Sequence, residues 1–275
     1  MTDKLKQDMG LPDSTQDLSS EMEVDAFRKI FPLRFFERHL SESLRPDGRP
    51  LGKARDTIVN LGLVSSADGS ALAKIGSTTM LAAIRMEVMT PSTDAPDEGC
   101  IAIEFHMPPI CSPTVRPGRP ADAAPDIYCL DADGALFDAA LLSAVAAFSN
   151  LQIPVVALND NGRIVTITGE EGQDNASITK KEAVNKEKRK LTLTNIPFSL
   201  TCLLHKNYVL ADPTAEEESI MDTLLTVVLD SSDQIVSFSK PGGSIANSSA
   251  IKSCIELTKK RGKELKQILG EMDID

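Results

Sequence analysis

Residues 126–148 constrain the fold more than any other stretch, because they combine a strand, a turn and a helix in one continuous run. Residues 126–130 are mostly apolar, which is typical of a buried strand. The turn dipeptide Asp133-Gly134 follows, and an apolar helix is predicted from Asp138 to Leu151. Such a unit often forms a catalytic site, because carboxylates at the strand end meet anions held at the helix N-terminus. Here the acids are present, but the groups that would hold an anion are missing.

The charge of the chain limits the partners it can bind alone. Its formal net charge is −11 over 275 residues. A chain this acidic is not expected to bind nucleic acid by itself, because the sum of its charges repels phosphates. It can still contribute a local basic patch, or act as one subunit of an assembly that shares a channel.

The cysteines and histidines do not form a metal-binding pattern. No Cys-x-x-Cys pair occurs, and the three histidines are isolated. We therefore expect free thiols in a reducing compartment, with no metal and no cofactor. The longest apolar run, residues 139–148, is too short to cross a bilayer, and no secretory signal is visible, so we expect no membrane contact.

The first part of the chain predicts two short helices and a meander of strands. Residues 1–20 are polar and are expected to be a disordered tail. Helices are predicted for Glu23–Ile30 and from Pro32, with the second one ending before a turn. The predicted strands are Thr57–Val64, Ala71–Ile75, Thr78–Val88 and Ile101–Met107. Residues 108–125 hold six prolines, so a helix cannot form there, although a parallel pairing of the next strand requires a crossover.

The second part predicts more strands and a long final helix, so we expect two α+β halves. The predicted strands are Val155–Leu158, Arg163–Thr168, Leu191–Thr194, Phe198–Leu204, Tyr208–Ala211, Leu224–Asp230 and Gln234–Ser239. The final helix is predicted from Ser248 to Gly270, with one apolar face and one lysine-rich face. The predicted boundaries are 1–31 for a disordered or helical extension, 32–152 for the first half, 153–190 for a connection with a hairpin, and 191–275 for the second half.

Six segments occur in an order that is specific as a set, although no single one of them is. They are Arg45–Arg49, Ser65–Ile84, Ser92–Gly99, Leu130–Gly134, Asp212–Glu218 and Lys240–Gly243. On these segments the chain resembles the ribonuclease PH family. The resemblance extends from Pro32 to Leu269.

The resemblance implies a ribonuclease PH-like α+β fold with two sheet-plus-helix halves. It also implies a hetero-hexameric ring of related exosome subunits, with RNA-binding cap subunits and RNA in a shared channel. Active members of the family look like phosphate-dependent 3′-to-5′ exoribonucleases. That chemistry requires carboxylates for proton transfer or metal binding, and donors that hold phosphate.

The family's catalytic pattern, Asp-Val-x-x-Ala-Asp-Gly-Gly-Thr-Arg-Thr, is degenerate in this chain. Asp133 and Gly134 match it, but Tyr128 stands where the strand carboxylate is expected, and a phenol cannot act as a carboxylate at neutral pH. Phe137 cannot hold phosphate, and Asp138 would repel it. A structural role explains the acids equally well, since Asp138 is a natural N-cap and Asp133-Gly134 a turn. We therefore expect a catalytically inactive ribonuclease PH paralogue.

Other candidate site residues also have simpler explanations. Gly242-Gly243 could cradle a phosphate but is more typical of a turn. Glu216–Glu218 could bind a metal but is more typical of an acidic first helical turn. Lys180–Lys190 is typical of a solvated face. Arg116 and Arg119 are RNA-channel candidates, because the family places arginines in such loops. The equally weighted alternative is that they lie in a solvent-exposed loop without contacting RNA.

One departure from the family concerns the junction Pro125-Asp126. Family members have a long helix and a further strand between the proline-rich loop and the strand that begins here. We infer an internal deletion that truncates the first half and exposes apolar surface on its sheet. The expected function is a non-catalytic exosome ring subunit supporting RNA degradation and ribosomal RNA processing in the nucleus, nucleolus and cytoplasm. The alternatives are a phosphate-dependent exoribonuclease and a truncated isoform that cannot assemble.

Overall fold

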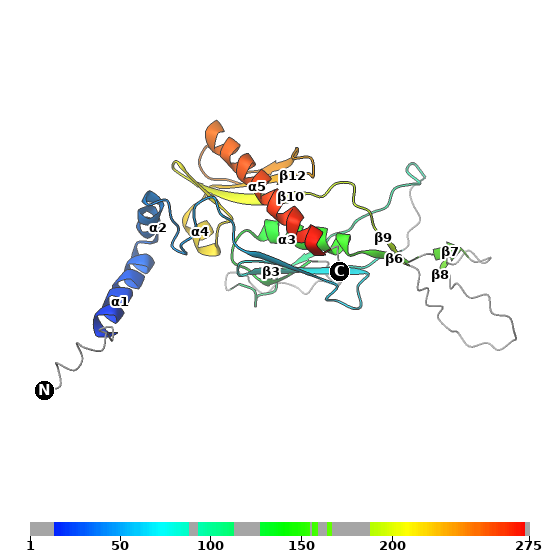
Figure 1. Ribbon diagram of the computed structural model, residues 1–275, viewed down its shortest axis with the longest axis horizontal. Coiled ribbons are helices and arrows are strands. Elements are labelled where there is room, and N and C mark those ends of the chain that lie inside the picture. The colour runs from blue at the N-terminus through cyan, green and yellow to red at the C-terminus, as the bar shows by residue number, and fades with distance from the viewer. Residues whose placement is uncertain are drawn as a thin grey trace.

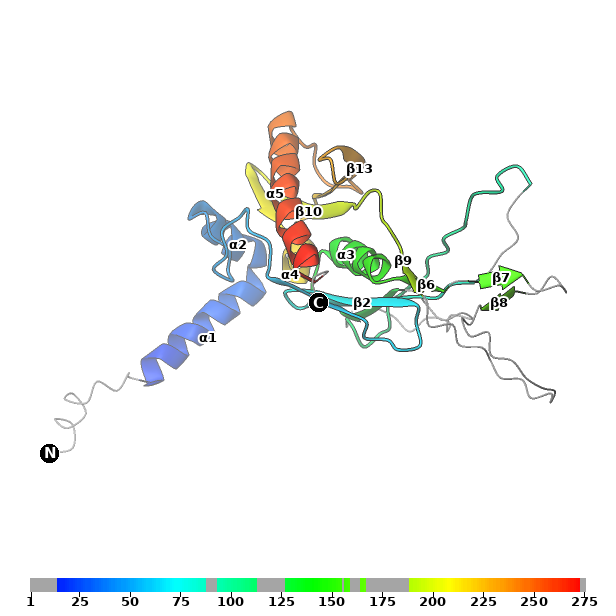
Figure 2. The same ribbon diagram turned by 45° about the vertical axis from the view of Figure 1, so that its right-hand side comes forward.

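The structure, a computed structural model, describes residues 14–87, 93–112, 127–154, 156–158, 164–166 and 188–272. Its two larger sheets form two layers, and helix α3 (Leu136–Ser149) lies between them with α5 (Ser248–Met272) beside it (Figures 1 and 2). Within these residues no helix is long and apolar enough to cross a membrane. This architecture confirms the predicted α+β fold.

The first sheet contains five strands in the order β1-β2-β3-β5-β4. Their bounds are β1 Thr57–Leu61, β2 Gly69–Ile75, β3 Thr78–Ile84, β4 Phe105–His106 and β5 Ile127–Asp131. The β2–β3 hairpin turns at Gly76-Ser77, between the two strands predicted at Ala71–Ile75 and Thr78–Val88, with Ile75 opposite Thr78 and Gly76 at a φ of 57°. β4 is parallel to β5 and forms one edge of the sheet.

The second sheet contains four antiparallel strands in the order β11-β10-β12-β13. Their bounds are β10 Phe198–His205, β11 Tyr208–Ala211, β12 Leu224–Leu229 and β13 Ile235–Ser239. β10 is buried along almost its whole length because it pairs on both sides and is covered by α3 and α5. Each of these strands lies within two residues of its prediction.

Helix α3 is apolar all round because it is covered by both sheets. It packs on β2 and β3 of the first sheet and on β10 of the second. A Cβ atom added at Gly69 would lie 2.7 Å from the Ala147 carbonyl oxygen, so glycine permits this close approach of β2 to α3. The core around the helix includes Met80, Cys129, Leu142, Phe198 and Leu265, which are all buried. This core joins the two halves.

Two N-terminal helices, α1 (Ser14–Ile30) and α2 (Pro32–Ser41), precede the sheets, and α1 projects away from the rest of the molecule (Figure 2). On α2, Phe36 and Leu40 are buried in a cluster with Leu203 and Leu210 of the second half. The short helix α4 (Ala215–Ile220) follows β11. The N-terminal part of the first half is therefore anchored on the second sheet.

Two small hairpins connect the halves. β6 (Gln152–Pro154) pairs with β9 (Lys188–Lys190), and β7 (Val156–Leu158) pairs with β8 (Ile164–Thr166). The second pair falls within the two strands predicted at Val155–Leu158 and Arg163–Thr168, and the residues between them lie outside the described part of the chain.

Several predicted boundaries were wrong. Residues 14–20 belong to α1, whereas a disordered tail was expected. In the region predicted as the strand 101–107, only Phe105–His106 pair, and the strand expected at 191–194 lies earlier, at 188–190. Helix α3 begins at Leu136, so Asp138 is in its first turn and is not its N-cap.

Candidate functional site

The turn after β5 lies against the backbone that precedes α4. Gly134 has a φ of 72°, and a Cβ atom there would be 2.6 Å from the Thr214 carbonyl carbon. Thr78 fixes the turn from the other side: its hydroxyl donates to the Gly134 carbonyl (2.8 Å) and accepts from the Asp133 amide (3.2 Å). The motif around Thr78 therefore holds the Asp133-Gly134 turn in place.

Arg55 connects this turn to Asp212, the first residue after β11. Its Nε and Nη2 donate to the Asp212 carboxylate at 2.9 and 2.7 Å, and its Nη1 donates to the Asp133 carbonyl at 2.5 Å. Burial alone would raise the pKa of Asp212, but the hydrogen bonds and positive charge of Arg55 outweigh it and hold that pKa below its ordinary value. Asp212 is therefore an ionised structural partner of Arg55.

Arg45 makes a second buried ion pair, with Glu217 of α4. Only 1% of Arg45 and 2% of Glu217 is exposed. The guanidinium binds both carboxylate oxygens, with Nε donating to Oε1 at 2.9 Å, and Nη1 donates to the Ala211 carbonyl at 2.6 Å. Glu217 also accepts from the Thr214 amide (2.9 Å), which completes a capping box at the start of α4. The acidic run 216–218 is thus the first helical turn that the sequence favoured over a metal site.

The N-terminus of α3 is already bound by a carboxylate. The Ala135 amide donates to Glu218 Oε1 at 2.8 Å. Burial raises the pKa of Glu218 above its ordinary value and outweighs the hydrogen bond from Ala135 and the positive charge of Arg55, while nearby Asp212 and Asp133 add to the increase. A phosphate at this helix end would have to displace Glu218 and would face these acids. We call the six residues Arg45, Arg55, Asp133, Asp212, Glu217 and Glu218 the seam cluster.

The residues of the predicted catalytic remnant do not converge on one point. Asp133 belongs to the seam cluster, and its Oδ1 accepts from the Ala215 amide at 3.2 Å. Tyr128 lies on the opposite face of β5 from α3, with its ring 5.1 Å from that of His106. Phe137 is 52% exposed. Asp138 is buried and accepts from the Thr201 amide of β10 at 2.6 Å.

A surface pocket of about 290 Å³ lies beside the seam cluster. Its charged lining consists of Arg28, Asp47, Asp133, Glu216 and Glu217. Each acid of the lining is paired with an arginine: Glu216 with Arg28, Glu217 with Arg45, Asp47 with Arg49 and Asp133 with Arg55. The arginines around the pocket therefore already bind carboxylates. This pocket is unsuited to phosphate.

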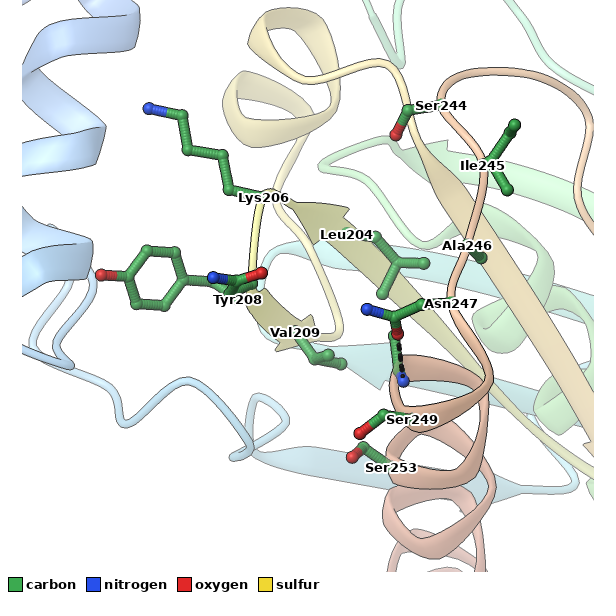
Figure 3. Close-up of a pocket in the computed structure, with 12 residues that line it drawn as sticks. Leu204, Lys206, Tyr208, Val209, Ser244, Ile245, Ala246, Asn247, Ser249 and Ser253 are labelled. Carbon is green, nitrogen blue, oxygen red and sulfur yellow. Dashed lines mark hydrogen bonds between the residues drawn. The ribbon is translucent and has the colours of Figure 1, made fainter.

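A second pocket, of about 280 Å³, lies at the start of α5 (Figure 3). Leu204 and Val209 face the segment that leads into the helix, whereas Lys206 extends away from it toward Glu37, 2.7 Å from Nζ. Asn247 accepts from the Ala250 amide at 2.7 Å and so occupies one helix N-terminal donor. The nearby Gly242-Gly243 forms a bend, with Gly243 at a φ of 78°. The lysine that could favour an anion here is already paired.

Arg116 and Arg119 lie outside the described residues, so their proposed position toward RNA stays a prediction. The residues that reasoning from the sequence missed are Arg45 and Arg55. Both lie in or near the Arg45–Arg49 motif. The signal that could have found them is the excess of acids in the motifs 131–134 and 212–218, because buried acids need positively charged partners.

Comparison with known proteins places the motifs in a family context. A model of the 3′ exoribonuclease family, domain 1, matches residues 53–127, and the domain 2 model matches residues 195–261. The chain is 26% identical over 269 residues to the exosome complex component rrp43 of Schizosaccharomyces pombe, covering 86% of this chain and 94% of that protein. It is 29% identical over 264 residues to the exosome complex component Rrp42 of Pyrococcus furiosus, covering 84% and 89%.

Solved structures share the fold. A chain of the Archaeoglobus fulgidus exosome with RNA bound to the active site has a TM-score of 0.68 and 25% identity, covering 90% of this chain and 98% of that chain. A chain of an archaeal exosome core has a TM-score of 0.63 and 24% identity, covering 90% and 99%.

Proposed function

Because the chain belongs to the 3′ exoribonuclease, or ribonuclease PH, family, we propose that it is a non-catalytic ring subunit of the RNA exosome. Its relatives from S. pombe and P. furiosus are named exosome components, which supports this role. Its partners are other ribonuclease PH-like subunits, RNA-binding cap subunits and RNA in the shared channel. The ring supports 3′-to-5′ RNA degradation and ribosomal RNA processing.

The observation that carries catalytic inactivity is the carboxylate at the N-terminus of α3. Phosphorolysis needs a phosphate held by donors near the RNA end. Here the Ala135 amide already donates to Glu218, and Asp133 and Asp212 are close enough to raise the pKa of Glu218. Phosphate binding would bring an anion against these acids, with Arg55 already committed to Asp212.

A phosphorolysis assay tests this proposal. The purified chain is incubated with single-stranded RNA and inorganic phosphate, and released nucleoside diphosphates are measured against a phosphorolytic family member. We expect no release above the sample without phosphate. Release that saturates with phosphate concentration would favour the alternative, a phosphate-dependent exoribonuclease in its own right.

Ring assembly needs a separate test. We expect the tagged chain to co-purify in stoichiometric amounts with the other ribonuclease PH-like subunits. In the purified ring, replacing Arg116 and Arg119 with alanine should reduce RNA crosslinking to this subunit, whereas replacing the exposed Arg189 should not. Equal crosslinking in both variants would remove the two loop arginines from the RNA path.

The second candidate is a truncated form that does not assemble, and the apolar surface of the first half favours it. Ile101, Ile103 and Phe105 are 68%, 62% and 49% exposed near the edge strand β4. The domain 1 match ends at Ile127, immediately after the inferred deletion at Pro125-Asp126. The alignment with the S. pombe relative is 269 residues long, but it covers only 86% of this 275-residue chain. The alignment is longer than the part of this chain that it covers, so the relative has residues without a counterpart here.

Two measurements separate this candidate from the ring subunit. Sequencing the transcript across the codons for Pro125 and Asp126 tests the junction. Binding of a dye specific for exposed apolar surface, together with absence of the ring partners in a pull-down, would support the unassembled form. A cooperative thermal unfolding transition with no dye binding would oppose it.

The domain boundaries and the location in the cell are also proposals. We propose an extension at 1–31, halves at 32–152 and 191–275, and a connection at 153–190, which limited proteolysis should cleave first. As an exosome subunit the chain is expected in the nucleus, nucleolus and cytoplasm. Imaging of the tagged protein tests this distribution.

A further inference from the structure

Two buried polar atoms face each other across the boundary between α3 and β10. Asp138 Oδ1 belongs to the first turn of α3, and Ser199 Oγ belongs to β10. Within the described part of the chain, neither atom has a hydrogen-bond partner, and their residues are 6% and 5% exposed. Buried polar atoms of native proteins are almost always paired with protein or with ordered water.

Both side chains line one small cavity. Its remaining polar lining comes from Asp212 and Arg261, and its apolar lining includes Ile75 and Leu265. The cavity has a volume of about 10 Å³, which is room for one water-sized sphere. A larger organic ligand does not fit.

The other polar groups of the lining already have partners. Asp212 binds Arg55, and Arg261 donates to the Thr57 hydroxyl and to the Arg55 carbonyl (3.4 Å). Asp138 Oδ2 accepts from the Thr201 amide. The unused hydrogen-bonding capacity in the cavity therefore belongs to Asp138 Oδ1 and to the Ser199 hydroxyl.

We propose that this cavity is a binding site for one ordered water molecule, which donates to Asp138 Oδ1 and bonds the Ser199 hydroxyl. A water supplies two donors and two acceptors, so it can satisfy a carboxylate oxygen and a hydroxyl at once. A direct bond between the two groups is the competing arrangement. Ser199 is close enough to lower the pKa of Asp138, but the two atoms do not meet in hydrogen-bond geometry.

Burial is the main influence on the pKa of Asp138. Burial raises this pKa to about 6, and the nearby Ser199 hydroxyl and the hydrogen bond from the Thr201 amide limit the increase. A water at Oδ1 can serve as donor to the ionised carboxylate and as acceptor from the protonated carboxyl.

The position of the water gives it a structural role. The water would connect α3, which packs on the first sheet, to β10, the first strand of the second sheet along the chain. The direct Asp138–Thr201 bond crosses the same boundary. The water and the Asp138–Thr201 hydrogen bond would together form a polar contact within the core that joins the halves.

A crystal structure at a resolution that shows ordered waters tests the site directly. We expect a density peak within hydrogen-bond distance of both Asp138 Oδ1 and Ser199 Oγ. An empty cavity, or a Ser199 hydroxyl bonded directly to Oδ1, would overturn the proposal.

Solution NMR gives a second, independent test on the intact chain. A long-lived water in the cavity should transfer magnetisation to the amide protons of Leu200 and Thr201. Ser199→Ala should reduce this transfer several-fold, because the water loses one partner. Ser143→Ala removes another buried hydroxyl, which bonds the Ala140 carbonyl, and should leave the transfer unchanged. Absence of transfer in the wild-type chain, or equal transfer in both variants, would contradict the proposed site.

Discussion

The raised pKa of Asp138 predicts a stability change that a single substitution can isolate. Burial is the largest cause of the increase from the ordinary value of 3.8 to about 6, and the nearby Ser199 hydroxyl and the hydrogen bond from the Thr201 amide oppose it. Asp138→Asn keeps the size of the side chain and an oxygen that can accept from the Thr201 amide. It replaces the ionisable carboxyl with a neutral amide, whose N–H₂ group takes the place of Oδ1.

The sign of the effect follows from proton binding. Since the pKa of Asp138 is higher in the folded state than in the unfolded chain, the folded state binds the proton more tightly. The contribution of Asp138 to the free energy of unfolding therefore increases as the pH falls from above 6 to below 4. Above pH 6 the ionised carboxylate destabilises the fold. A difference of about 2 pKa units corresponds to about 3 kcal/mol in the free energy of unfolding.

We therefore expect Asp138→Asn to be more stable than the wild type at pH 7.5, by up to about 3 kcal/mol, and to lose this advantage near pH 4. The measurement is urea unfolding followed by far-ultraviolet circular dichroism at several pH values. Taking the difference between variant and wild type at each pH cancels groups such as Asp212, whose pKa is lowered and whose contribution has the opposite sign.

The exposed Asp56 provides a matched control. Its carboxylate is at the surface, so Asp56→Asn should change the free energy of unfolding only slightly. If Asp138→Asn destabilises the chain equally at pH 4 and pH 7.5, burial does not raise the pKa of this carboxyl and the prediction is wrong.

Two further substitutions, each with a control, test the seam cluster and the turn beside it by urea unfolding. Arg45→Met should cost about 3–5 kcal/mol because Glu217 is left buried and unpaired, whereas Arg28→Met breaks the partly exposed pair with Glu216 and should cost at most about 1 kcal/mol. Similar losses would refute the distinction. Gly134→Ala should destabilise the chain by more than about 2 kcal/mol, since it combines a positive φ with a collision, while Gly48→Ala, with open space around it, should cost about 1 kcal/mol.

The second half could be predicted from sequence because its signals are local. β10 and β11 are joined by a tight turn at Lys206-Asn207, where Lys206 has a φ of 53°. α5 has a period of apolar residues over its whole length, and its start is marked by Asn247. Each signal lies within a few residues of the structure that it specifies, so no distant contact was needed to read it.

The start of α3 could not be predicted in this way because its cap is distant in sequence. Local rules select Asp138 as the N-cap, since it is the acidic residue just before an apolar run. In the structure Glu218, 83 residues later, accepts from Ala135, and Asp138 is free to bind Thr201, 63 residues later. The predicted strand 101–107 failed for a similar reason, because only its last residues find a partner in β5.

The motif acids look catalytic in sequence because acids at a strand end and at a helix start are what phosphoryl chemistry requires, but the structure gives them another task. Asp212 and Glu217 neutralise two arginines that are buried beneath the turn, and Glu218 caps a helix of the other half. Releasing one of these acids for proton transfer would leave a buried arginine or a helix end without its partner, at a cost of several kcal/mol. These motifs therefore have a structural role that does not depend on catalysis, because they hold the two halves together.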